Sequence, residues 1–419
     1  MRIFSAIYLF TCSFVFLNAA SVAQTRGNLD ESKVGRYTLP AILLKSDGSK
    51  VKNIADWEKH QRPQILKLFT ENVYGRIPGQ PAKMHFKIVD EDKTALNGKA
   101  TRKQVRIYFG ESEAVPFTTV LLYLPNNSNK KVPVFIGLNF DGNHTINEDT
   151  AIIITDHWLR LNSKTDIIVR GKQQKRWPVE ELIKQGYGVV TAWYEDFEAD
   201  YDQGWQSGIR TSLAESLSIQ PAEWGAIAVW GWGLSRIMDY LQTDPAVDAA
   251  KVVITGHSRL GKAALWSAAN DQRFAIVVSN NSGEGGAALA RINYGETVKL
   301  INEVFPHWFV DRYKTYNDDV NRLPVDQHML LALMAPRPLY VASATEDQWA
   351  DPKGEFLSAY YAGEVYSMYG KKGVGVKDMP TAEKPVGETV KYHIRTGAHD
   401  MIIYDWLEYI KFANRHFKK

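Results

Sequence analysis

Cysteine, net charge and long apolar segments are all scarce in this chain of 419 residues. The single Cys and the formal net charge of +3 provide neither a disulfide framework nor a strongly charged surface. A nucleic-acid partner or a membrane surface would need a clustered basic face, so neither is expected. With 45% hydrophobic and 23% charged residues, the composition also excludes disordered and collagen-like proteins. A globular protein remains.

The N-terminus has the pattern of a cleavable signal peptide. Arg2 precedes an almost wholly apolar run over 3–16, and Ser21-Val22-Ala23 offers a small-x-small cleavage site. The run is shorter than the roughly 20 residues of a membrane-spanning helix, and no later stretch is long and apolar enough. We therefore expect a signal peptide over 1–23 and a periplasmic or secreted protein. Cleavage removes Cys12, which excludes cysteine catalysis and cysteine-ligated metals.

Hydrophobic patterns predict strands that alternate with helices. Apolar or alternating runs predict strands at 84–89, 104–109, 118–124, 132–138, 188–193, 251–255, 274–279, 338–344 and 389–396. Helices are predicted at 57–70, 178–185, 224–241, 260–269 and 400–417. This alternation implies a three-layer α/β sandwich whose mostly parallel sheet is covered on both faces. Because no repeat or linker is visible, residues 24–419 are expected to form one domain with an irregular lead-in over 24–80.

One segment, at 252–262, carries the clearest sign of chemistry. An apolar strand runs into Gly256-His257-Ser258 and then directly into helix-forming residues, which is the context of a nucleophile elbow. The general elbow pattern is G-x-S-x-G, whereas here Leu260 holds the last Gly position and Gly261 follows one residue later. A serine at such a turn can also be a plain helix N-cap, so this segment alone leaves both interpretations open.

Two later strand ends favour the catalytic interpretation. Hydrolases of the α/β-hydrolase fold place the acid and then the histidine after the nucleophile. Strand 338–344 is followed by Thr345-Glu346-Asp347, and strand 389–396 by Gly397-Ala398-His399. Because the carboxyl ends of parallel strands lie at one edge of a sheet, Ser258, Asp347 and His399 can meet there.

The segment GHSRLGK at 256–262 resembles the G-x-S-R-x-G-K signature of the bacterial glucuronoyl esterases, carbohydrate esterase family 15. The likeness covers about residues 130–415 and includes GLNF (137–140), GNH (142–144), DQRF (271–274), SGEGGAA (282–288), FPHWF (305–309), LPVDQH (323–328), APRP (335–338) and WADP (349–352). The resemblance implies an α/β-hydrolase fold. It also implies a cofactor-free serine esterase that cleaves the ester between (4-O-methyl-)glucuronic acid of glucuronoxylan and a lignin-type alcohol.

The resemblance implies roles for individual residues. Ser258 would be the nucleophile, His399 the general base, and Arg259 would stabilise the oxyanion through its backbone N–H and its guanidinium. The positions that hold the uronate sugar in the family match Lys262, Glu296 and Trp349. The alternative for these three is a solvated Lys, a solvated Glu and a core Trp.

The sequence departs from the family pattern in two places. Asn281 stands where some relatives carry a catalytic Glu, and an amide has no charge to stabilise imidazolium. Asp347 is therefore the expected acid, with Glu346 and Glu284 as alternatives. Many relatives carry cysteines where this chain has Glu284 and Val310, so a bridge that ties this loop is missing here.

Other segments give weaker indications. The acidic run at 195–200 is expected to be a solvated loop, and the basic run at 170–177 either a solvated insertion or a subsite for an acidic glycan. His257 is expected to pack behind the serine. The 12 Trp and 20 Tyr suit either sugar stacking or core filling. No catalytic metal is expected, because no H-E-x-x-H or comparable spacing joins His144, His157, His307 and His328.

The expected function is that of a monomeric serine esterase acting on plant cell-wall glucuronoxylan or its oligosaccharides. A carbohydrate acetyl esterase, similar to an acetyl xylan esterase, would share the triad but make little use of Lys262, Glu296 and Trp349. A non-catalytic glycan-binding relative would tolerate loss of the triad, which is intact here. A serine peptidase would need a gating domain before the hydrolase core, and none is evident in the sequence.

Overall fold

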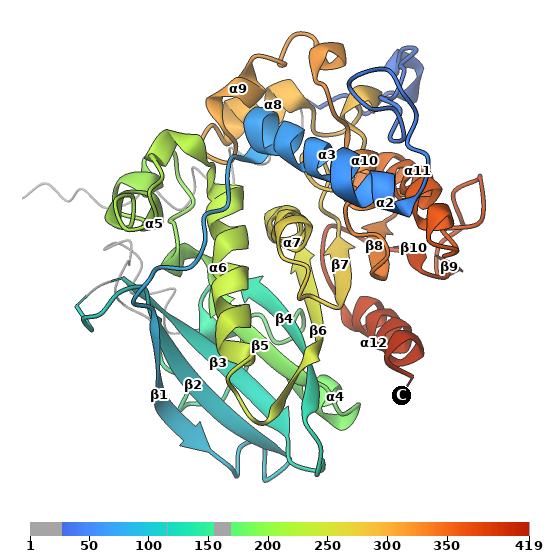
Figure 1. Cartoon of the computed structure of the whole chain (residues 1–419). Coiled ribbons are helices and arrows are strands. Elements are labelled where there is room, and N and C mark those ends of the chain that lie inside the picture. Colours follow the sequence, from blue (N-terminus) through green and yellow to red (C-terminus); the bar gives the residue numbers. More distant parts are fainter. Residues whose placement is uncertain (1–26, 115, 155–168, 419) are drawn as a thin grey trace, which may run out of the picture.

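A computed structural model describes residues 27–114, 116–154 and 169–418. Within these ranges the strands form one ten-stranded sheet with the order β1-β2-β3-β5-β4-β6-β7-β8-β10-β9 (Figure 1). The strands are β1 (His85–Asp92), β2 (Ala100–Tyr108), β3 (Phe117–Pro125), β4 (Val132–Asn139), β5 (Gly188–Trp193), β6 (Val247–His257), β7 (Ile276–Asn280), β8 (Leu339–Ala344), β9 (Val386–Gly387) and β10 (Val390–Arg395). Neighbouring strands from β5 to β10 run parallel, and β1, β2, β3 and β9 pair antiparallel at the two edges.

Helices cover both faces of the sheet. They are α2 (Ile54–Asp56), α3 (Arg62–Phe69), α4 (Val179–Lys184), α5 (Ile209–Ser212), α6 (Ala226–Leu241), α7 (Arg259–Asn270), α8 (Val298–Val304), α9 (Asp311–Lys314), α10 (Gln327–Ala332), α11 (Pro352–Met368) and α12 (Ile403–Phe417). Helices α6 and α7 share a buried cluster with one face of the sheet, and α4 and α12 share a second cluster with the other face. The predicted three-layer arrangement is therefore present.

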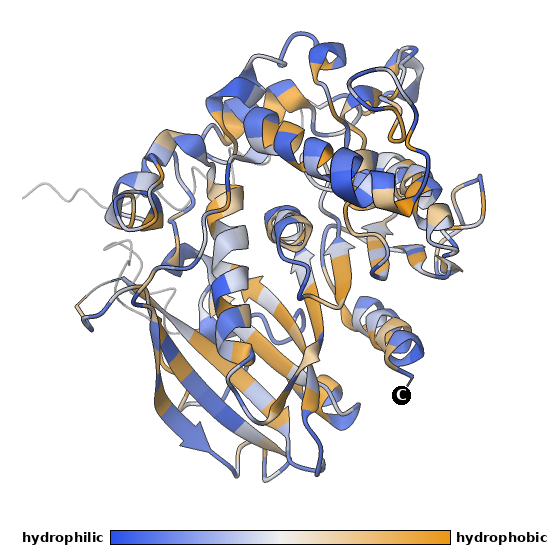
Figure 2. Ribbon diagram, viewed as in Figure 1, coloured by the Kyte–Doolittle hydropathy of each residue, from blue (hydrophilic) through white to orange (hydrophobic). Residues whose placement is uncertain are grey.

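Alternation along each central strand supplies both clusters. In β4, Val134 and Ile136 join the cluster of α6 and α7, whereas Phe135 points to the opposite face and meets Trp406 of α12 at 5.5 Å between ring centroids. A strand buried on both faces has few polar residues, which explains why the hydrophobic colour predominates along the central strands in Figure 2. Much of the aromatic content fills this core: Trp57, Trp224, Trp230, Trp232, Trp266 and Trp406 are all fully buried.

The sequence patterns located the long strands and five helical segments to within a few residues, but they missed β9 and the helices α5, α8, α9, α10 and α11. The longest of these is α11. This helix begins after Asp351, whose carboxylate accepts a hydrogen bond from the Gly354 backbone N–H, with Pro352 in the first turn. Its buried positions include small, polar and aromatic residues on several sides, so no single apolar stripe marks it. The predicted signal peptide lies outside the described residues. No helix in the described part of the chain is long and apolar enough to cross a membrane.

Candidate active site

Ser258 lies at a sharp turn between β6 and α7. Its backbone has φ 57° and ψ −131°, a strained conformation that exposes a side chain at the start of a helix. The turn requires Gly256, because a Cβ there would lie 2.1 Å from the carbonyl oxygen of Leu260. Gly261 meets a second constraint: a Cβ there would lie 3.0 Å from Ser282 Cβ. The displaced second glycine of this motif therefore serves close packing, and Ser258 has the geometry of a nucleophile elbow.

His399 and Asp347 are in direct contact at the same edge of the sheet. Asp347 follows β8, and His399 lies in the loop after β10, the parallel neighbour of β8. The His399 Nδ1 and Asp347 Oδ2 atoms are 2.6 Å apart, with the Asp347 side chain completely buried and the His399 side chain 37% exposed. Asn281 donates from Nδ2 to the same Oδ2 atom at 2.7 Å. The family's alternative acid position thus holds an amide that fixes the Asp347 carboxylate.

The other two carboxylates considered for this role lie in different surroundings. Glu346 is exposed. Glu284 is buried and its Oε1 accepts a hydrogen bond from the Tyr313 hydroxyl at 2.6 Å. Burial raises the pKa of Glu284 to about 8, although the Tyr313 hydrogen bond works against this shift. A carboxyl that is neutral at pH 7 cannot stabilise an imidazolium, so the geometry favours Asp347 as the partner of His399.

Hydrogen bonds hold the segments around Glu284 and Val310, where this chain has no disulfide. Besides the Glu284–Tyr313 contact, the Tyr74 hydroxyl donates to the Gly285 carbonyl at 2.9 Å. The Val310 backbone N–H donates to the Val73 carbonyl at 3.0 Å. Buried polar contacts therefore tie the segments where the family resemblance implies a bridge in many relatives.

Arg259, the first residue of α7, forms an ion pair with Asp200. The other Asp200 oxygen accepts hydrogen bonds from His307 Nε2 at 2.8 Å and Trp308 Nε1 at 2.7 Å. The guanidinium carbon of Arg259 also lies 4.8 Å from the centre of the Trp308 ring. Burial by itself would raise the pKa of Asp200, but the Arg259 charge and the His307 contact hold it well below its usual range. The carboxylate is therefore an anion that fixes the guanidinium of Arg259, the residue after Ser258.

The sequence prediction for the acidic run at 195–200 was wrong. Instead of a solvated loop, the run is a buried turn in which Glu198 pairs with Arg210 and Asp200 with Arg259. The Glu198 and Asp200 carboxylates tolerate burial because arginines face them, whereas burial raises the pKa of Asp196 to about 8. The only signal in the sequence was the local density of acids. In the basic run at 170–177, Lys172 is exposed, whereas Arg176 pairs with Asp400 at 2.6 Å.

Lys262 lies on α7 one helical turn beyond Arg259, and it forms a buried pair with Glu296. Lys262 Nζ donates to the Ser282 carbonyl at 2.8 Å and lies 3.4 Å from Glu296 Oε2. It also lies 5.5 Å from the centre of the Trp308 ring. Burial raises the pKa of Glu296, and the Lys262 charge partly offsets that effect. Neither residue is the solvated side chain of the alternative interpretation.

Trp349 is joined to this pair through its backbone. Its carbonyl oxygen accepts a hydrogen bond from the Glu296 backbone N–H at 2.9 Å, and its side chain is partly exposed. The loop after β8 therefore carries both Asp347 and Trp349, and Trp349 connects it to Glu296. This partly exposed ring is not the core Trp of the alternative interpretation.

His257 packs behind the candidate site. Its ring centre lies 4.5 Å from that of His399, and its Nδ1 atom is 2.6 Å from Asn280 Oδ1. Burial and the neighbouring His399 hold its pKa well below the usual value. A neutral His257 can support His399 without repelling an imidazolium. Among the described residues, no group of three or more His, Cys, Asp and Glu side chains is arranged to hold a metal ion.

Comparisons with known proteins match this geometry. A family model described as "Glucuronyl esterase, fungi" matches residues 182–370. The chain is 46% identical to "Carbohydrate esterase MZ0003" from an unidentified prokaryote, over 94% of this chain and 93% of that protein. A solved glucuronoyl esterase from Solibacter usitatus is 46% identical, with a TM-score of 0.87 over 93% of this chain and 100% of that chain. A structure described as a promiscuous CE15 esterase from a marine bacterial metagenome is 45% identical, with a TM-score of 0.86 over 93% and 100%.

These matches identify an α/β-hydrolase, and they confirm the fold predicted from the sequence. The chain belongs to carbohydrate esterase family 15, the glucuronoyl esterases. The family resemblance carried by the GHSRLGK segment is thereby confirmed.

Proposed function

We propose that this protein is a serine esterase that hydrolyses the ester between the carboxyl of (4-O-methyl-)glucuronic acid in glucuronoxylan and a lignin-type alcohol. The observation that carries the proposal is the position of three features at the carboxyl ends of the parallel strands. These are the strained Ser258 elbow, the His399–Asp347 hydrogen bond and the Arg259 guanidinium at the next residue. The family membership supports the same substrate class.

The reaction follows from the roles of these groups. Ser258 Oγ attacks the ester carbonyl while His399 takes its proton, and Asp347 stabilises the imidazolium that forms. The Arg259 backbone N–H and guanidinium face the developing oxyanion, where each well-placed donor is typically worth about 3–4 kcal/mol. His399 then protonates the departing alcohol, which leaves an ester between Ser258 and the uronate carboxyl. Water activated by His399 hydrolyses this intermediate and restores the serine.

Lys262, Glu296 and Trp349 are proposed to hold the sugar. The substrate carboxyl is esterified and neutral, so Lys262 would donate a hydrogen bond to a hydroxyl, and Glu296 would accept one. Each cation of the site already has a carboxylate partner, Arg259 with Asp200 and Lys262 with Glu296. This pairing limits the attraction for the anionic uronate product and so favours its release.

The natural substrate is proposed to be plant cell-wall glucuronoxylan or its oligosaccharides, met outside the cytoplasm. The N-terminal pattern at 1–23 supports a periplasmic or secreted location. We propose that the enzyme acts as a monomer, since the groups assigned to the reaction all come from one chain.

One side-by-side assay tests the proposal. The purified protein is given a methyl or benzyl ester of glucuronate and, separately, an acetylated sugar. We expect a much higher kcat/KM on the uronate ester, and loss of that activity in S258A. A higher kcat/KM on the acetylated sugar would replace the proposal with a carbohydrate acetyl esterase. No activity on either substrate would favour a glycan-binding protein.

A further inference from the structure

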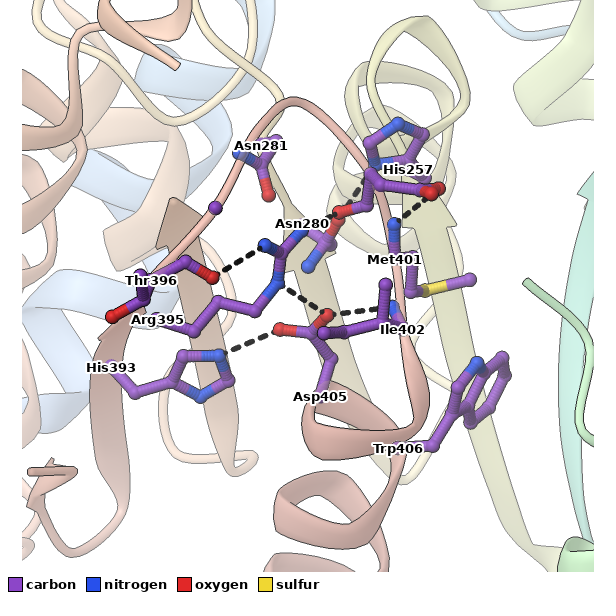
Figure 3. A network of polar contacts seen from close by, with 12 residues as sticks. His257, Asn280, Asn281, His393, Arg395, Thr396, Met401, Ile402, Asp405 and Trp406 are labelled. Carbon is purple, nitrogen blue, oxygen red and sulfur yellow. Dashed lines mark hydrogen bonds and ion pairs between the residues drawn. The ribbon is translucent and has the colours of Figure 1, made fainter. Parts of the chain in front are cut away.

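The loop that carries His399 is held by one buried arginine. His399 lies between the end of β10 and the start of α12, and Arg395 is the last residue of β10. The Arg395 Nη2 atom donates to the Ala398 carbonyl at 3.0 Å and to the Asp400 carbonyl at 2.6 Å. One guanidinium therefore binds the carbonyls on both sides of His399. Figure 3 shows it beneath the arc of this loop.

The Arg395 guanidinium is itself held by Asp405 of α12. Its Nε atom donates to Asp405 Oδ2 at 2.9 Å, and the same oxygen accepts a hydrogen bond from the Ile402 backbone N–H at 2.8 Å. Asp405 Oδ1 lies 2.9 Å from Nε2 of His393 (Figure 3). The other ring nitrogen of His393 lies 2.8 Å from the Tyr340 hydroxyl. Arg395 is 2% exposed, and Asp405 and His393 are completely buried. The loop is thus anchored in the core between β10 and α12.

We propose that Arg395 is a positioning residue for His399, and this inference rests on the proposed function. A planar guanidinium donates in several fixed directions at once, which lets it reach Asp405 and both flanking carbonyls. A lysine ammonium at the end of a longer flexible stem cannot reproduce that set of contacts. The loop also has little room to adjust, because a Cβ on Gly397 (φ 119°) would lie 3.0 Å from Arg395 Nη1.

Loss of the Arg395 contacts should then disturb the position of His399 more than it disturbs sugar binding. A misplacement of about 1 Å in a reacting group can cost roughly 10²-fold in rate. The sugar-holding residues Lys262, Glu296 and Trp349 come from other segments. Loss of the Arg395 contacts should therefore lower kcat and leave KM nearly unchanged.

The experiment compares two buried arginines. Arg291 is the matched control because it also pairs with a buried carboxylate, Asp326, at 3.1 Å and donates to loop carbonyls, including that of Val325 at 2.7 Å. R395K, R291K and H399A are assayed on the benzyl ester of glucuronate at a temperature where near-UV circular dichroism shows each variant folded. We expect R395K to lower kcat by about 10- to 100-fold with KM within about threefold, and R291K to stay within about threefold of wild type.

A second variant tests the contact chemically. R395A leaves a cavity of the shape of a guanidinium group. Millimolar guanidinium chloride should raise kcat of R395A by at least about tenfold and should not raise kcat of R291A. If R395A does not fold, R395A/D405N removes the unpaired buried charge and is tested in the same way.

The outcomes separate this inference from the proposed function. Full activity in H399A would overturn the proposed function itself. Loss of activity in H399A together with wild-type kcat in R395K would overturn only the positioning role. Equal kcat losses in R395K and R291K, or a rise in KM without a fall in kcat, would show that Arg395 only stabilises the fold.

Discussion

Replacing Asp347 by Asn isolates the charge of the carboxylate that contacts His399. The Asn281 Nδ2 atom donates to Asp347 Oδ2, the same oxygen that lies 2.6 Å from His399 Nδ1. An asparagine at 347 satisfies Asn281 best by placing its amide oxygen there, so the hydrogen bond to His399 survives. The variant then differs from wild type mainly in the missing negative charge.

The magnitude follows from Coulomb's law. Two unit charges about 3–4 Å apart interact by roughly 4–5.5 kcal/mol at an effective dielectric constant of about 20. That value suits this pair, because the carboxylate is buried whereas the imidazole side chain is 37% exposed to screening water. Since each 1.36 kcal/mol is tenfold in rate, kcat should fall by about 10³- to 10⁴-fold.

The assay measures kcat of D347N on a methyl or benzyl glucuronate ester, with E284Q and E346Q as matched controls. Both controls convert a carboxyl near the site to an amide and should keep kcat within about threefold of wild type. Near-UV circular dichroism checks that all three variants are folded. A mild effect in D347N together with a severe one in E284Q would refute the assignment and move the acid to the loop after β7.

Three further predictions use the same assay or a thermal scan. S258A should lower kcat by about 10³-fold or more, and activity within about tenfold of wild type would remove the serine from the mechanism. K262A and E296A should each lower kcat/KM on the glucuronate ester by about 5- to 150-fold. The same variants should hardly change the rate on a small activated acetate ester. Equal losses on both substrates would mean that the Lys262–Glu296 pair supports only the fold. For Glu284, burial raises the pKa from 4.5 to about 8, so the stability that its protonated form contributes is complete below about pH 4.5 and lost as the pH rises to about 8. The Tm of E284Q relative to wild type should therefore increase across that range, and a constant difference would show that Glu284 is ionised in the fold.

Local patterns were sufficient where one segment determines its own structure. The strand predicted at 188–193 is β5, with the same bounds, because a buried parallel strand must be apolar along its whole length. The elbow was readable because Gly256, Ser258 and the following helix are contiguous. The rule that parallel strand ends share one edge was enough to predict that the segments after β8 and β10 lie close together, although Asp347 and His399 are 52 residues apart in sequence.

Burial of charged groups was not readable from local patterns. The run at 195–200 has the composition of a solvated loop, yet Asp200 lies in the interior because Arg259, His307 and Trp308 surround it. Arg259 is 59 residues further along the chain, and nothing near Asp200 in the sequence indicates its partner. The desolvation cost of a carboxylate is offset only when the folded chain brings cations and N–H donors to it.

The sequence by itself determined the class of fold, the family, the elbow at Ser258 and the two strand ends after which Asp347 and His399 lie. These depend on hydrophobic periodicity and short contiguous motifs, which act within a few residues. Only the tertiary structure decided which carboxylate faces His399, which acid is neutral and which anion holds Arg259. It also placed Arg395 beneath the His399 loop, between Asp405 and the two flanking carbonyls. Ionisation and hydrogen-bond partners depend on distances of a few ångströms between distant segments, and those distances arise only when the sheet and its helices pack together.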